Sequence, residues 1–157
     1  MSTSMNGTHL NIRNNGNGVV KQGAATAPHQ SILVVEDDFE TQQMMKDILR
    51  NEYCVLTAKS AREAMDILES SQVDLVLMDM MLHESESGLE LTRRIRHRWP
   101  QQRLPIIALT AHAFKAQGAS CIAAGCDDYV TKPFHIVELR QLLRRHIDAV
   151  SHSENPT

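Results

Sequence analysis

Short apolar runs alternate with segments of helical period over residues 31–149. The central run, 73–79, is almost continuously apolar and ends in a carboxylate, which is typical of a strand buried on both faces of a parallel sheet. The other predicted strands are 32–36, 53–58, 106–109 and 128–130. Strands that alternate with helices indicate an α/β protein. We predict a flavodoxin-like, doubly wound, five-stranded parallel sheet with helices on both faces.

The segments between these strands have helical periodicity, which predicts that they form helices. The apolar face of the first helix is expected to comprise Met44, Met45, Ile48 and Leu49. Ser60 is predicted as the N-cap of the second helix, with Glu63 completing a capping box. A third helix is expected over about 87–97, a fourth closes at Gly125, and a fifth runs over about 135–150.

Polar segments flank this pattern. Residues 1–30 are rich in Asn, Gly, Ser and Thr and cannot bury enough apolar surface to offset the entropy of ordering, which predicts a disordered N-terminal tail. Residues 150–157 are predicted as a polar C-terminal tail. The length of 157 residues suits one domain over 31–149. We expect a stand-alone protein without an output domain; excision from a longer hybrid protein is the alternative.

Composition argues against several classes of protein. The formal net charge of −3 and the aromatic content of 4% are atypical of nucleic-acid binding. Apolar runs stay well short of the roughly 20 residues that span a bilayer, and the first residues lack the order of a signal peptide. The three cysteines form no CxxC pair, which favours a reducing compartment. We expect a cytoplasmic protein that binds neither nucleic acid nor membrane.

Polar groups follow most of the predicted strands. Asp37 and Asp38 follow the first strand, Asp79 ends the third, Thr110 follows the fourth and Lys132 the fifth. Because the carboxyl ends of parallel strands share one edge of the sheet, these side chains should converge. A carboxylate can act as the nucleophile in phosphoryl transfer, and carboxylate oxygens suit Mg2+. The set predicts a magnesium-dependent phosphoryl-acceptor site at Asp79.

Each of these residues also has a plainer interpretation. Asp37, Asp38 and Thr110 are suitable helix N-caps, and a loop lysine such as Lys132 is usually a solvated surface residue. Glu36 would contribute to the site electrostatically. Several carboxylates packed together raise the pKa of at least one of them, so a bound divalent cation is the simpler account of the cluster.

The ordered set of motifs resembles the receiver domain of two-component response regulators. The motifs are ILVVEDD at 32–38, LMD at 77–79, ALTA at 108–111 and GCDDYVTKPF at 125–134. The resemblance covers about residues 31–147. It implies that Asp79 is the phosphoacceptor. It also implies a Mg2+ ion bound by Asp37, Asp38, Asp79 and the main-chain carbonyl of Met81.

The resemblance further implies a switch. Thr110 would be the switch hydroxyl, Tyr129 the aromatic side chain whose rotamer accompanies it, and Lys132 a phosphate ligand before a cis bond to Pro133. The phosphodonor would be a histidine kinase or a histidine phosphotransfer protein. The output would be binding of a downstream protein, or self-dimerisation, through the face of the fourth helix, fifth strand and fifth helix. Such a domain catalyses only its own phosphorylation and dephosphorylation.

One segment departs from the family pattern. Residues 80–88 lack the usual proline and are about one residue longer, and His83, Glu84 and Glu86 are expected to face solvent, with a reach toward the metal or a docking partner as the alternative. Two other functions stay open. A receiver-like adaptor would no longer accept phosphate. A phosphatase of the haloacid dehalogenase type needs a second acid two residues after its nucleophile, where this chain has Met81.

Overall fold

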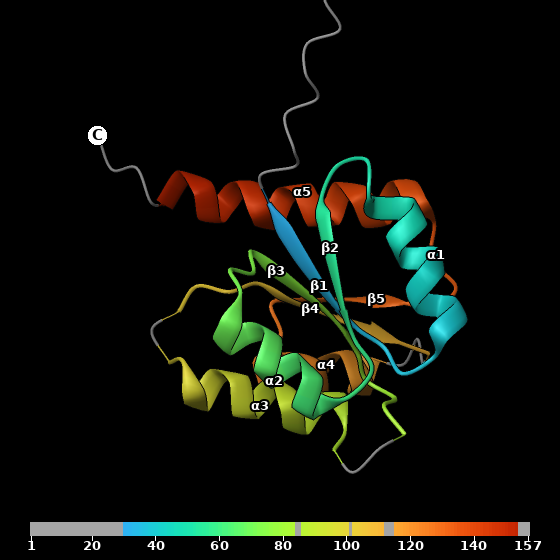
Figure 1. The fold of residues 1–157 in the computed structure, drawn as a ribbon. Coiled ribbons are helices and arrows are strands. Elements are labelled where there is room, and N and C mark those ends of the chain that lie inside the picture. The colour runs from blue at the N-terminus through green and yellow to red at the C-terminus, as the bar shows by residue number, and fades with distance from the viewer. Residues whose placement is uncertain (1–29, 84–85, 101, 112–114, 154–157) are drawn as a thin grey trace, which may run out of the picture.

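The computed structural model describes residues 30–83, 86–100, 102–111 and 115–153, and it contains a five-stranded sheet (Figure 1). The strands are β1 (Ser31–Val35), β2 (Cys54–Ala58), β3 (Leu75–Asp79), β4 (Ile106–Thr110) and β5 (Asp128–Thr131). The helices are α1 (Phe39–Leu49), α2 (Ala61–Ser70), α3 (Gly88–Arg98), α4 (Lys115–Ala124) and α5 (Ile136–Ser153). Neighbouring strands are parallel in the order β2-β1-β3-β4-β5, which confirms the flavodoxin-like prediction.

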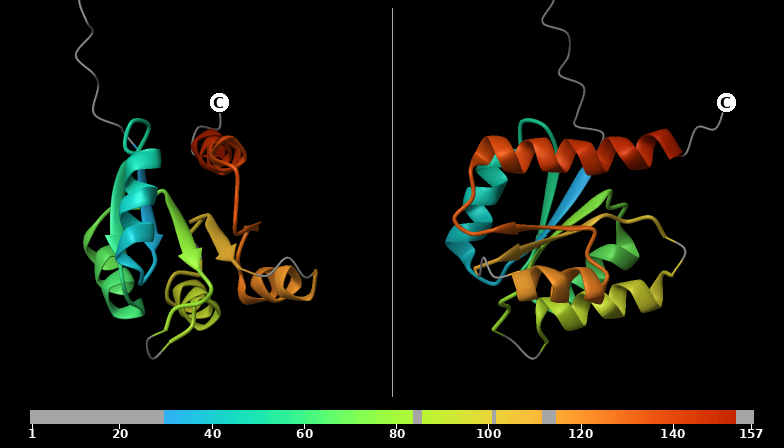
Figure 2. Two further views of the ribbon diagram at one scale, coloured as in Figure 1. Left: turned by 90° about the vertical axis from the view of Figure 1, so that its right-hand side faces the viewer. Right: turned by 180° about the vertical axis from the view of Figure 1, so that it is seen from behind.

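Helices cover both faces of the sheet (Figure 2). Helices α1 and α5 pack on one face, and α2, α3 and α4 pack on the other. Alternate residues of β3 serve the two faces: Leu75 and Leu77 join the core beneath α1 and α5, whereas Val76 and Met78 join the other core. All five residues of β3 are buried, which explains its continuous apolar sequence.

The helix starts differ in detail from the prediction. Ser60 caps α2 by accepting from the Glu63 N–H, but the Glu63 carboxylate bonds the N–H of Lys59 instead of closing a capping box on Ser60. A complete capping box does occur at α3, where Ser87 and Glu90 bond each other's backbone N–H. It stabilises the helix start at the end of the unusual 80–88 segment.

The C-terminal boundary and one core residue also differ from the prediction, whereas the N-terminal boundary is not tested. The N-terminal tail prediction lies outside the described residues apart from residue 30. Helix α5 continues to Ser153, into the predicted polar tail, because Ser151 and His152 bond the carbonyls of Ile147 and Asp148 one turn earlier. Met44 was expected in the core of α1 but is 46% exposed, since it lies beside the buried stripe. None of the described helices is both long and apolar enough to cross a bilayer.

Candidate functional site

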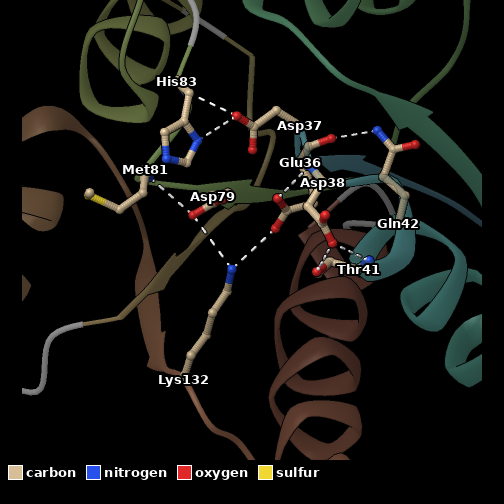
Figure 3. Close-up of polar contacts among 9 residues, drawn as sticks. All are labelled: Glu36, Asp37, Asp38, Thr41, Gln42, Asp79, Met81, His83 and Lys132. Carbon is tan, nitrogen blue, oxygen red and sulfur yellow. Dashed lines mark hydrogen bonds and ion pairs between the residues drawn. The ribbon is translucent and has the colours of Figure 1, made fainter.

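Three carboxylates meet at the carboxyl edge of the sheet (Figure 3). Among the described residues, Glu36, Asp37 and Asp79 each offer an oxygen, and these oxygens lie within 4.8 Å of one another. Glu36 is 2% exposed and Asp79 is 4% exposed, so two of the three are almost completely removed from water. Buried charges of one sign repel, and a cation is needed to stabilise all three in the ionised form.

Glu36 is the first residue after β1, and its neighbours hold it in place. Its backbone N–H still bonds the Ala58 carbonyl at 2.9 Å, as if the strand continued. Its Oε1 accepts from the Asp38 N–H at 3.0 Å, and its carbonyl accepts from the Gln42 side chain. Burial raises the pKa of the Glu36 carboxyl, and the charge of Asp79 adds to this effect. Glu36 is therefore fixed in position but costly to ionise without a cation.

Lys132 supplies one such cation. Its Nζ lies 3.1 Å from Glu36 Oε2 and 3.7 Å from Asp79 Oδ1, so one ammonium bridges two buried acids (Figure 3). The Lys132 N–H donates to the Thr110 carbonyl at 2.7 Å, which aligns the end of β5 with the end of β4. The Lys132–Pro133 bond is cis, as the resemblance implied. The prediction that Lys132 converges on Asp79 agrees with this geometry.

Asp37 faces the loop that follows β3. Its Oδ2 accepts two hydrogen bonds from His83, from the backbone N–H at 2.9 Å and from Nδ1 at 2.7 Å. Burial raises the pKa of the Asp37 carboxyl, but the bonds from His83 outweigh burial, and the pKa is lowered. The same contact raises the pKa of His83. The His83 side chain is 81% exposed, as expected of a solvent-facing residue. It also contacts Asp37 of the acidic cluster, which agrees with the alternative of a reach toward the metal.

Asp38 is not brought into this group. It is the N-cap of α1, and its Oδ2 accepts from the Thr41 N–H at 2.7 Å and the Thr41 hydroxyl at 2.6 Å. Both bonds lower the pKa of the Asp38 carboxyl, which is exposed. The N-cap interpretation therefore describes Asp38, while Glu36 occupies the inner position. The spacing of Asp38 and Thr41 was the sequence signal for this difference.

The structure also describes most of the remaining predicted residues. Thr110 ends β4, is 3% exposed, and lines a cavity of about 260 Å³ between the end of β3 and α4. The Met81 N–H donates to Asp79 Oδ1 at 3.1 Å. Tyr129 is 39% exposed, and its ring lies against Gly118 of α4. Glu86 pairs with Arg94, and Glu84 lies outside the described residues.

The acidic group fits a magnesium ion. Ligand oxygens 2.0–2.1 Å from an octahedral Mg2+ lie roughly 3 Å apart when adjacent and roughly 4 Å apart when opposite. The oxygens of Glu36, Asp37 and Asp79 lie within 4.8 Å of one another, which is close to these separations. Mg2+ commonly keeps several waters, so one or two direct carboxylate bonds are enough. A divalent ion here would also stabilise the ionised form of Glu36, whose pKa is raised by burial and by the charge of Asp79.

Known proteins share both the sequence and the fold of this chain. The chain is 38% identical over 119 residues to the transcriptional regulatory protein YvrH of Bacillus subtilis, covering 74% of this chain but only 48% of that protein. It is 29% identical to the polar-differentiation response regulator DivK of Brucella ovis, covering 75% of this chain and 96% of DivK. The match to YvrH thus spans about half of that longer protein.

A solved structure agrees with these relatives. The receiver domain of the sensor histidine kinase PA1611 from Pseudomonas aeruginosa, which has a magnesium ion coordinated in its active-site cleft, is 38% identical with a TM-score of 0.69. The alignment covers 76% of this chain and 98% of that domain. The family model of the response regulator receiver domain matches residues 32–144, which include every site residue described above. The chain therefore belongs to the response regulator receiver domain family of two-component signalling proteins.

Proposed function

We propose that this receiver domain accepts a phosphoryl group on Asp79 in a magnesium-dependent reaction. The observation that carries the proposal is the position of Asp79: it ends the buried strand β3, beside Glu36 and Asp37, with the Lys132 ammonium 3.7 Å from its Oδ1. A short carboxylate on a rigid strand has little freedom to move away from an incoming phosphorus atom. Membership of the family supports the same role.

In the proposed reaction, a carboxylate oxygen of Asp79 attacks the phosphorus of a phosphohistidine. The new O–P bond forms as the P–N bond breaks, and the departing imidazole takes a proton from solvent. Lys132, already 3.1 Å from Glu36, turns its ammonium toward the phosphoryl oxygens as their charge approaches the site. Bound Mg2+ would neutralise charge on those oxygens. Water attack on phosphorus later breaks this O–P bond, which releases inorganic phosphate and restores the carboxylate.

The geometry favours a revised set of metal ligands. We assign the ion to Glu36, Asp37 and Asp79, with the Met81 carbonyl as a further ligand, as the resemblance implies. Asp38, included in the sequence-based set, already caps α1 through Thr41 and serves the helix start. A contribution of Asp38 to the metal would have to come from Oδ1, because Oδ2 already accepts both N-cap bonds from Thr41.

The proposed response begins at Thr110, which lies at the end of β4 beside the cavity next to α4. Movement of its hydroxyl toward the phosphoryl group would change the space available to Tyr129, and so the surface of α4, β5 and α5. We place the domain in the cytoplasm, and the proposed phosphodonor is a histidine kinase or a histidine phosphotransfer protein. A downstream protein or a second copy would bind the α4–β5–α5 surface.

Intact mass after incubation with acetyl phosphate and Mg2+ tests the proposal. The parent should gain one phosphoryl group that is labile to base, whereas Asp79→Asn should gain none. Asp38→Asn is the matched control, because asparagine also serves as an N-cap, and it should accept phosphate like the parent. Equal labelling of the Asp79→Asn variant would contradict the site. A folded parent that binds Mg2+ but is not labelled would favour the adaptor function.

A further inference from the structure

The contact between His83 and Asp37 links two loops that are far apart in the chain. His83 follows β3 and Asp37 follows β1, 46 residues earlier. Both the backbone N–H and Nδ1 of His83 bond the same atom, Asp37 Oδ2 (Figure 3). The Asp37 side chain is 18% exposed, against 81% for His83, so the imidazole covers the acid from the solvent side.

Two donors on one oxygen leave the other oxygen of Asp37 for a cation. A carboxylate oxygen has two lone-pair positions, and those of Oδ2 are taken by the two bonds from His83. The carboxylate is thereby held in one orientation, with Oδ1 as the atom that lacks a donor from His83. A ligand fixed before the ion arrives loses less conformational freedom on binding.

We propose that His83 is a positioning residue of the metal site, which orients Asp37 and so strengthens binding of a divalent cation. The inference rests on the proposed function, since it takes Asp37 to be a metal ligand. It assigns a role to the 80–88 segment, in which this chain departs from the family pattern. His83 acts through Asp37 and is not itself a ligand in this proposal.

The effect should appear in metal affinity and not in folding. A contact made by a largely exposed side chain contributes little to stability, so loss of the imidazole should leave the unfolding midpoint almost unchanged. By contrast, hydrogen-bond partners of metal ligands commonly change metal affinity 10- to 100-fold. The exposure of His83 and the retained backbone N–H bond favour the lower end of that range.

Mn2+ binding to the full chain tests the proposal, with the electron paramagnetic resonance signal of free Mn2+ as the readout. His83→Ala should bind Mn2+ about tenfold more weakly than the parent. His83→Asn should bind nearly as well as the parent, because its amide N–H lies close to the position of Nδ1. His97→Ala removes an exposed histidine from the far end of α3 and should match the parent.

The outcomes distinguish a failure of the positioning role from a failure of the metal site itself. If the parent binds Mn2+ and is phosphorylated but His83→Ala binds equally or more tightly, the positioning role is overturned and the proposed function stands. An asparagine variant as weak as the alanine variant overturns it too, since a donor at that position then has no effect. A folded parent that binds no Mn2+ overturns both the metal site and the inference.

Discussion

Gly88 brings the start of α3 directly against the backbone that carries Asp79. A Cβ atom at this position would lie 2.2 Å from the Asp79 carbonyl oxygen and 2.9 Å from the Met80 Cα, whereas real Cβ atoms keep at least 3.0 Å. Both contacts are backbone atoms, and neither can turn aside. The Gly88→Ala substitution therefore forces α3 or the end of β3 to move.

The magnitude follows from packing. Oversized side chains in a packed core usually cost about 1–3 kcal/mol, and a clash with backbone belongs near the upper end. Gly88 is the first residue of α3, so the helix gains little from alanine in return. We expect Gly88→Ala to lower the free energy of unfolding by about 2–3 kcal/mol. For a domain of this size that corresponds to a drop in Tm of roughly 8–12 °C.

Urea unfolding and Mn2+ titration measure the two consequences of Gly88→Ala. Because the carbonyl oxygen that the new Cβ would displace belongs to Asp79, the affinity for the metal should fall together with the free energy of unfolding. Gly118→Ala is the matched control: the three atoms nearest to its Cβ would all belong to the Tyr129 phenol group, at 2.5–2.8 Å, and this partly exposed side chain can move toward solvent. Inside α4, alanine gains about 1 kcal/mol over glycine, so this variant should stay close to parental stability. A Gly88→Ala variant within about 0.5 kcal/mol of the parent would refute the reasoning.

Two further predictions concern the Lys132 ammonium and the buried Cys126 thiol. Lys132→Met should lower the free energy of unfolding of the metal-free protein by about 2 kcal/mol, which is less than the loss of a fully buried ion pair costs because Lys132 is 30% exposed. Mg2+ should then raise the stability of the variant more than that of the parent. An equal rise in both proteins would contradict the bridging role of Lys132. Burial raises the pKa of the Cys126 thiol from 9.0 to about 11. The folded state holds this proton more tightly, so its stabilisation is present below pH 9 and about 2 kcal/mol is lost as the pH rises toward 11. Urea midpoints of the parent should fall more steeply over that interval than those of Cys126→Ala.

The fold follows from sequence patterns because the deciding signals are local. The three central strands β1, β3 and β4 are apolar on both faces, and short right-handed connections restrict how parallel strands can be ordered. Placement of polar residues at strand ends predicted that Asp79 and Lys132 would meet, since every parallel strand delivers its last residue to the same edge. This part of the site is a consequence of topology.

The assignment within the acidic run could not be predicted in the same way. Residues 36–38 leave the strand through a turn, and the turn, not the strand, decides which side chain points inward. It places Glu36 beside Asp79 and leaves Asp38 at the helix start. The contact of His83 with Asp37 joins two loops, and no local pattern encodes such a pairing. Sequence patterns predict least where the backbone is irregular.

The separation of the two cores has a consequence for divergence within the family. The buried residues beneath α1 and α5 and those beneath α2, α3 and α4 form distinct clusters, with no residue in both. Substitutions in one layer can accumulate while the packing of the other is retained, so the two outer surfaces can adapt to different partners. Strands β3 and β4 contribute to both clusters and are constrained from both sides. The strand that ends in Asp79 is thus among the parts of the chain least free to vary.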